Sequence, residues 1–87
     1  MDFYLTHHAE QELKRRDIPR IFLNRVLRNP QQIVDERDDR RAYQSQIEFA
    51  NGKIYLVRAI VDEETEPNTV VTVYRTSRIS KYWRADP

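Results

Sequence analysis

The chain has 87 residues, enough for one domain spanning residues 1–87, and it has no cysteine, which excludes disulfides and thiolate metal sites. A net charge of +1 excludes a protein that binds polyanions over its whole surface. No apolar run approaches the roughly 20 residues of a membrane span, and the start lacks the apolar stretch of a secretory signal, so we expect a cytoplasmic protein with no membrane partner.

The first part of the chain predicts a short strand and a helix. Residues 2–5 are expected to form the strand, and residues 6–17 the helix. Thr6 is a suitable N-cap for this helix, and Ala9 and Leu13 form a narrow apolar stripe. The helix should therefore pack on one side only.

A second helix is expected up to Pro30. Asp17 or Ile18 is the expected cap, and Pro19 suits the first turn, where its missing N–H is not needed. Pro30 ends the helix, because the residue before a proline is disfavoured in helical geometry. Apolar residues at three- and four-residue spacing predict the buried face: Ile18, Ile21, Phe22, Val26 and Leu27.

The remainder predicts strands over residues 32–36, 41–50, 53–61 and 70–76, with an acidic loop at 63–68 and a short helical tail at 79–83. Asn51-Gly52 is a strong hairpin signal, and a two-residue turn there pairs Ala50 with Lys53. That register places Arg58 opposite Ser45. These elements predict an α+β fold, with two N-terminal helices packed on an antiparallel sheet.

The predicted register divides the sheet into an apolar and a polar face. The apolar face, expected against the helices, carries Tyr43, Ser45, Ile47, Phe49, Ile54, Leu56, Arg58 and Ile60. The polar face carries Gln44, Gln46, Glu48, Tyr55, Val57 and Ala59. In the last strand, Val71 and Val73 suit the core, which turns outward Thr72, Tyr74 and Thr76.

The pair His7-His8 at the start of the first helix is one candidate for chemistry. Neighbouring helical residues point about 100° apart, so the two do not chelate a metal as a pair four residues apart does, and no metal site or cofactor is expected. The positive end of the helix dipole favours a neutral imidazole, which is able to act as a base. The alternative is a surface or capping histidine.

The polar sheet face and the basic C-terminal stretch form a second candidate. Aromatic side chains stack on bases and cations bind phosphates, so this surface is typical of an RNA-binding site. The residues that it would use are Tyr55, Thr72, Tyr74, Thr76, Arg75, Arg78 and Lys81. The alternatives are ordinary strand propensity for the threonines and tyrosines, and solvated faces for the basic stretches.

Several short motifs resemble a small bacterial family of unassigned function that is grouped with RelE/ParE-like and BrnT-like toxins. The motifs are Thr6-His7-His8-Ala9, Arg16-Asp17-Ile18, Asn29-Pro30, the hairpin, Thr72-Val73-Tyr74 and Lys81-Tyr82-Trp83. The resemblance implies a RelE-like β-α-α-β-β-β order. It also implies a metal-independent endoribonuclease of a type II toxin-antitoxin module, silenced by a small antitoxin, that acts on RNA, often in the ribosome.

The resemblance also implies roles for particular residues. His8 would act as base or acid, Arg58 with Arg41 or Lys81 would neutralise the phosphate, and Thr72 and Tyr74 would orient it or donate a proton. Tyr55 and Arg75 complete the expected nucleic-acid contacts. The chain departs from the family at Glu12, where an arginine or similar residue is frequent.

Two other functions are compatible with the sequence. One is a non-catalytic module that binds an antitoxin-like partner or nucleic acid through the basic stretches. The other is a ParE-like inhibitor of a DNA-processing enzyme.

Overall fold

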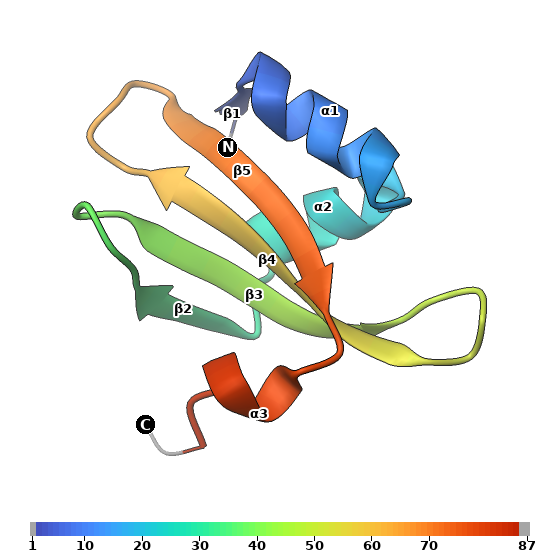
Figure 1. The fold of residues 1–87 in the computed structure, drawn as a ribbon. Coiled ribbons are helices and arrows are strands. Elements are labelled where there is room, and N and C mark those ends of the chain that lie inside the picture. The colour runs from blue at the N-terminus through green and yellow to red at the C-terminus, as the bar shows by residue number, and fades with distance from the viewer. Residues whose placement is uncertain (1, 86–87) are drawn as a thin grey trace.

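Two helices precede four consecutive strands in this α+β protein, as the sequence predicts (Figure 1). The computed structural model describes residues 2–85. Its elements are β1 (Phe3–Leu5), α1 (His7–Arg15), α2 (Arg20–Arg28), β2 (Gln32–Asp35), β3 (Arg41–Glu48), β4 (Ile54–Asp62), β5 (Asn68–Thr76) and α3 (Ile79–Tyr82).

The strands form one mixed sheet in the order β1-β5-β4-β3-β2. Strands β2 to β5 pair antiparallel with their neighbours, whereas β1 pairs parallel with β5. The prediction of a purely antiparallel sheet was therefore wrong. The first strand lies beside the last one, because α1 and α2 carry the chain from β1 at one edge of the sheet to β2 at the other edge, and the antiparallel strands β3, β4 and β5 then lead back to β1.

Helix α1 begins as expected, with the Ala9 N–H donating to Thr6 Oγ1 at 3.0 Å. It ends earlier than predicted, because Asp17 adopts a left-handed conformation with a φ of 52°. The Ile18 N–H then donates to the Leu13 carbonyl at 2.9 Å, which closes the helix in a Schellman motif. Asp17 thus terminates α1 instead of capping α2, whose N-cap is Pro19.

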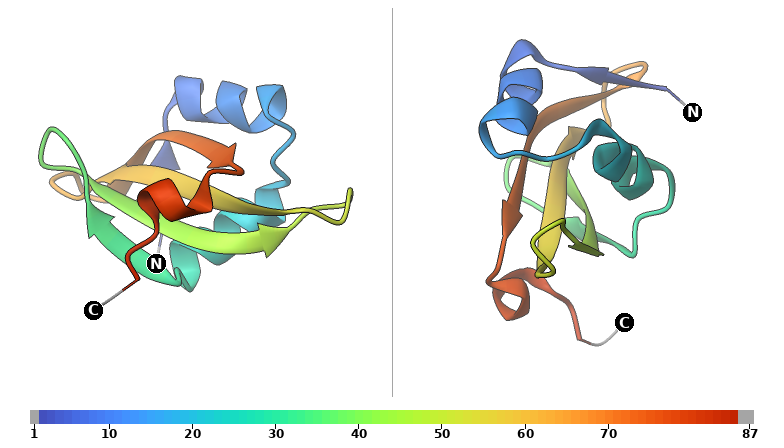
Figure 2. Two further views of the ribbon diagram at one scale, coloured as in Figure 1. Left: turned by 60° about the horizontal axis from the view of Figure 1, so that its bottom comes forward. Right: turned by 90° about the vertical axis from the view of Figure 1, so that its right-hand side faces the viewer.

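Helix α2 packs on β3 and β4, and α1 packs along β5 (Figure 2). The buried residues of α2 are Leu23, Val26 and Leu27. The prediction for Ile21 was wrong, because that side chain is 68% exposed. Both helices contribute to one apolar core on one side of the sheet.

The β3–β4 hairpin differs from the prediction by one residue. Phe49 donates its N–H to the Lys53 carbonyl at 2.9 Å, so the loop contains three residues, Ala50 to Gly52, with Gly52 at a φ of 82°. This is the hairpin loop that closes with a left-handed glycine, and it does not require a positive φ at Asn51.

The shift exchanges the two faces of β4, because side chains alternate along a strand. Gln44, and not Ser45, lies opposite Arg58. Tyr55 and the small residues Val57 and Ala59 therefore face the helices, which corrects their predicted place on the polar face. Arg58 moves to the other side of the sheet, which we call the α3 face.

Helix α3, the predicted tail, crosses the α3 face of the sheet (Figure 1). The Gln44 side chain donates through Nε2 to the Tyr82 carbonyl at 3.2 Å. The Tyr82 ring also lies over the Arg58 guanidinium, so α3 covers two polar side chains, Gln44 and Arg58, that are buried on this face. None of the helices in residues 2–85 is long and apolar enough to cross a membrane.

Candidate functional site

The structure brings four predicted site residues into one continuous line. His8 Nε2 lies 3.1 Å from Thr72 Oγ1. Thr72 and Tyr74 project from the same face of β5, since they are two residues apart. Arg58 of β4 is the direct strand partner of Tyr74 and donates to its hydroxyl at 2.6 Å.

His8 reaches this line because α1 starts directly beside β5. Thr6 Oγ1, which caps α1, also donates to the Val71 carbonyl at 2.9 Å and fixes the first turn of the helix to the strand. His8 is exposed on that turn, next to Thr72. One imidazole nitrogen thus contacts the threonine, while the ring stays open to solvent.

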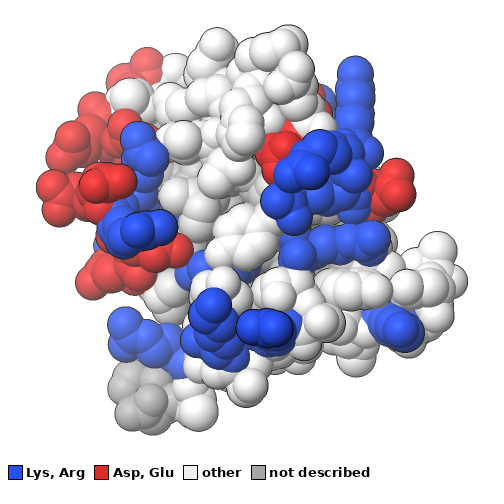
Figure 3. All heavy atoms as spheres, in the orientation of Figure 1, with Lys and Arg blue, Asp and Glu red and all other residues white. Residues whose placement is uncertain are grey.

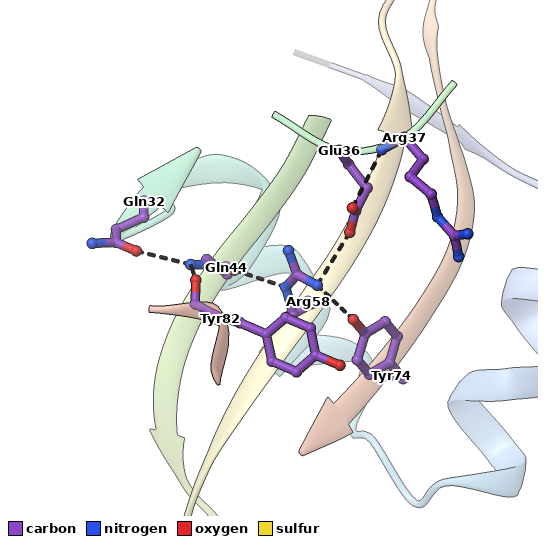
Figure 4. A network of polar contacts seen from close by, with 7 residues as sticks. All are labelled: Gln32, Glu36, Arg37, Gln44, Arg58, Tyr74 and Tyr82. Carbon is purple, nitrogen blue, oxygen red and sulfur yellow. Dashed lines mark hydrogen bonds and ion pairs between the residues drawn. The ribbon is translucent and has the colours of Figure 1, made fainter. Parts of the chain in front are cut away.

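Arg58 is the centre of a polar network (Figure 4). Its Nη1 donates to the Tyr74 hydroxyl and to Glu36 Oε2 at 3.2 Å, and its Nε donates to Gln44 Oε1 at 2.7 Å. The Arg58 guanidinium lies 4.3 Å from the centre of the Tyr82 ring. With an exposed fraction of 3%, this cation is held inside the protein and balanced by Glu36.

The network determines what the Tyr74 hydroxyl can do. A guanidinium only donates hydrogen bonds, so the Tyr74 oxygen accepts from Arg58, and the Tyr74 proton remains to be donated to another acceptor, of which the neighbouring Tyr82 is one. Burial raises the pKa of Tyr74 above its usual value, although the hydrogen bond from Arg58 opposes this shift. At neutral pH the Tyr74 side chain is therefore a protonated phenol, which has a proton to donate, and not a phenolate.

A hollow of about 390 Å³ opens beside two residues of this line, Thr72 and Tyr74. Its walls comprise Glu36, Arg37, Asp38, Arg40, Ile60, Thr72 and Tyr74. The sequence reasoning missed Arg37 and Arg40, because they lie within an acidic segment that is typical of a solvated turn. Their only sequence signal was the position of that segment between two strands of a hairpin.

Glu12, the position that departs from the resembling family, brings further cations to the site. Its buried carboxylate accepts hydrogen bonds from Arg15 Nε at 2.9 Å and from Arg16 Nε at 2.7 Å. These hydrogen bonds lower the pKa of Glu12 to about 2. The Arg16 guanidinium lies 6.0 Å from the centre of the Tyr74 ring, so the Glu12 pair positions a cation beside the tyrosine.

Three of the predicted nucleic-acid contacts lie elsewhere. Tyr55 packs on Phe49 with ring centres 5.1 Å apart, and the Arg75 guanidinium lies 4.6 Å from the centres of both rings. Arg41 shares the helix-covered face with Tyr43 and lies between two carboxylates, Asp35 at the end of β2 and Glu63 after β4. These three residues are separated from Arg58 by the sheet, a consequence of the register of β3 and β4.

Lys81 lies on the α3 face, where its Nζ is 5.3 Å from the centre of the Tyr82 ring. Figure 3, which has the orientation of Figure 1, shows an uncharged strip with basic side chains on both sides of it and below it. Most of the acidic side chains in this view gather at the left margin. Within residues 2–85, no three His, Asp or Glu side chains are arranged to hold a metal ion. The site thus contains hydrogen-bond donors, cations and two acids, Glu36 and Asp38, around an open hollow.

Comparison with known proteins gives a family but no activity. The chain matches no curated protein and no solved structure. A family model described as a domain of unknown function, DUF4258, matches residues 5–75, which include His8, Arg58, Thr72 and Tyr74. Since the match spans most of the 87 residues, the chain belongs to this family.

Proposed function

We propose that this protein is a toxin-like, metal-independent endoribonuclease of a type II toxin-antitoxin module, with a RelE-like fold. The observation that supports it most is the continuous line from His8 through Thr72 and Tyr74 to Arg58. His8 contacts the wall of the hollow at Thr72, and the wall itself contains the donor Tyr74 and two arginines. A base, a neutral donor and cations are the groups that RNA cleavage needs when the 2′-hydroxyl is the nucleophile.

The reaction requires two proton transfers and one exchange of bonds at phosphorus. His8 takes the proton of the 2′-hydroxyl, and the 2′-oxygen forms a bond to the adjacent phosphorus. The bond from phosphorus to the 5′-oxygen breaks, and that oxygen takes the hydroxyl proton of Tyr74. The products carry a 2′,3′-cyclic phosphate and a 5′-hydroxyl, and solvent returns the proton from His8 to Tyr74.

Arg58 acts in this scheme through Tyr74. Because it donates to the phenol oxygen at 2.6 Å, it stabilises the negative charge that develops when the proton leaves. Its burial and its pairing with Glu36 favour this positioning role over the direct phosphate contact expected from the sequence. Arg16, beside the Tyr74 ring, adds positive potential.

The partners follow from the proposed class. The substrate is RNA, free or on the ribosome, and a small antitoxin protein silences the enzyme in the cytoplasm. A neighbouring gene for a short acidic or DNA-binding protein would support this assignment.

The proposal is tested by inducible expression in a bacterial host. Expression of the wild type is expected to arrest growth and to cleave cellular RNA, whereas His8→Ala and Tyr74→Phe relieve both effects at equal protein levels. Arg28→Gln, an exposed change on α2, is the control and keeps the toxicity. Folded wild-type protein that neither arrests growth nor cleaves RNA contradicts the proposal.

A non-catalytic module that binds an antitoxin-like partner or nucleic acid is the second candidate. It is favoured by the ion pair of Arg58 with Glu36 at 3.2 Å, which neutralises the buried cation expected to meet the phosphate. In this case His8→Ala and Tyr74→Phe leave the phenotype unchanged. Charge reversal at Arg75 and Arg78 then removes binding.

A further inference from the structure

The turn between β2 and β3 carries two arginines beside the candidate site. Arg37 and Arg40 line the same hollow as Thr72 and Tyr74. Neither guanidinium forms an ion pair with a carboxylate within residues 2–85. Their charges are therefore available to a ligand in the hollow.

Glu36 holds this turn in place. Its Oε1 accepts the Arg37 backbone N–H at 3.3 Å, while its Oε2 accepts from Arg58, which in turn holds Tyr74. The turn closes through two further backbone hydrogen bonds, from the Glu36 N–H to the Arg40 carbonyl at 2.9 Å and from the Arg40 N–H to the Arg37 carbonyl at 3.2 Å. The two arginines are thus anchored to the same network that orients the tyrosine.

With Glu36 paired to Arg58, the charge balance among the residues that line the hollow is positive, whereas Asp39, the other acid of the turn, is not part of the lining. The charge of Glu36 is taken up by Arg58, and Asp35 lies 3.8 Å from Arg41 on the other side of the strand. Asp38, at the tip of the turn, is the remaining acid in the wall of the hollow. Figure 4 shows the Arg37 side chain extending away from Glu36 and toward β5.

The floor and size of the hollow indicate the class of ligand. Ile60 supplies an apolar floor between the arginines and the β5 side chains, which suits a ribose or base better than an acidic peptide. A volume of about 390 Å³ lies at the lower end of the range of roughly 300–1,000 Å³ for ligand pockets. This volume suits a single unstacked nucleotide.

We infer that the β2–β3 turn is the phosphate-binding element of this protein, and that Arg37 and Arg40 bind the backbone phosphate of a single-stranded RNA whose nucleotide lies on Ile60. This inference deepens the proposed function and rests on it for the identity of the substrate as RNA. It assigns the direct phosphate contact to the turn, in place of Arg58.

The test measures binding separately from cleavage. Fluorescence anisotropy follows a short labelled RNA of mixed sequence with 2′-O-methyl riboses, which has no nucleophile and stays intact. Arg37→Gln combined with Arg40→Gln is expected to weaken binding about tenfold at physiological salt. The same change should reduce the slope of log affinity against log salt by about 0.7, the value for one phosphate of a single strand that is no longer neutralised.

The matched control is Arg25→Gln combined with Arg28→Gln, an identical charge change on α2 across the sheet. It is expected to leave the affinity within about twofold of the wild type, since both arginines of the turn still bind phosphate. Arg37→Lys with Arg40→Lys, which keeps the charge, should retain most of the binding. Equal weakening by the two glutamine pairs overturns the inference, because it shows diffuse attraction by net charge.

Two other outcomes separate the inference from the proposed function. If the turn variant does not bind the modified RNA and the wild type binds it but cleaves no RNA, the phosphate site stands and the enzyme proposal fails. If the wild type cleaves RNA and the turn variant binds and cleaves normally, the enzyme proposal stands and the inference fails. An acidic peptide that binds through Arg37 and Arg40, where the modified RNA does not, also overturns it.

Discussion

The ion pair between Arg58 and Glu36 gives the sharpest prediction about stability. Glu36→Gln removes the negative charge next to a cation that is 3% exposed, while its side-chain amide oxygen still accepts one hydrogen bond. Removing one partner of a fully buried ion pair costs about 3–5 kcal/mol. Because Glu36 is 29% exposed and glutamine keeps one hydrogen bond, we expect a loss of about 2 kcal/mol in the free energy of unfolding.

Asp35→Asn is the matched control for this change. Asp35 is the neighbouring residue and also lies near an arginine, 3.8 Å from Arg41, but its side chain is 88% exposed. Exposed ion pairs contribute about 0–1 kcal/mol, so this variant should lose less than about 0.5 kcal/mol. The contrast between the two carboxylates isolates the effect of burial.

Urea unfolding, followed by circular dichroism and by the fluorescence of the single tryptophan, Trp83, measures both variants. A loss of about 2 kcal/mol lowers the melting temperature of a domain of this size by about 8–16 °C. Equal stabilities of Glu36→Gln and Asp35→Asn would refute the reasoning, since they would show that the Arg58 charge does not depend on its partner.

Three further predictions concern other parts of the molecule. Tyr74→Phe should lower the rate of RNA cleavage by about 100-fold, because the proton donor is lost, and should leave the affinity for 2′-O-methyl RNA unchanged. Glu12 has a pKa of about 2 in the folded protein against 4.5 ordinarily, so it contributes stability above about pH 4.5 that is lost as the pH falls toward 2. In urea titrations, the difference in unfolding free energy between the wild type and Glu12→Gln should therefore shrink as the pH falls from about 4.5 toward 2. A difference that stays constant over this pH range would contradict the prediction. Gly52→Ala should cost about 1 kcal/mol of unfolding free energy from the left-handed backbone alone, since a Cβ there meets no atom within 4 Å. Gly52→Asn should lose less unfolding free energy than Gly52→Ala, because asparagine tolerates the left-handed conformation better than alanine does.

The sequence was sufficient for the order and type of the elements, because these depend on local signals. Thr6 caps α1 as expected, and Pro30 follows the end of α2. The parallel pairing of β1 with β5 had no local signal, since it depends on how the helices carry the chain across the sheet.

The candidate site was predicted in part for a similar reason. Thr72 and Tyr74 share a face by simple strand alternation, and His8 follows a cap that fixes the start of the helix. Arg58 was placed on the wrong face, because a three-residue hairpin loop with a left-handed Gly52 differs by one residue from the two-residue turn that the sequence suggested.

The arginines of the β2–β3 turn were missed for a physical reason. In the sequence Arg37 and Arg40 are interspersed with acids, so a count of charges along the chain gives no positive balance there. Only the fold shows that Glu36 turns inward to Arg58 and leaves the two arginines at the hollow.

The measurement that tests the central claim most directly is the chemistry of the RNA ends after incubation with purified protein in a metal chelator. The account predicts fragments with a 2′,3′-cyclic phosphate and a 5′-hydroxyl, formed by the wild type and absent with His8→Ala. Folded wild-type protein that leaves RNA intact, both free and on ribosomes, would contradict it, as would fragments of other end chemistry or an activity that His8→Ala retains.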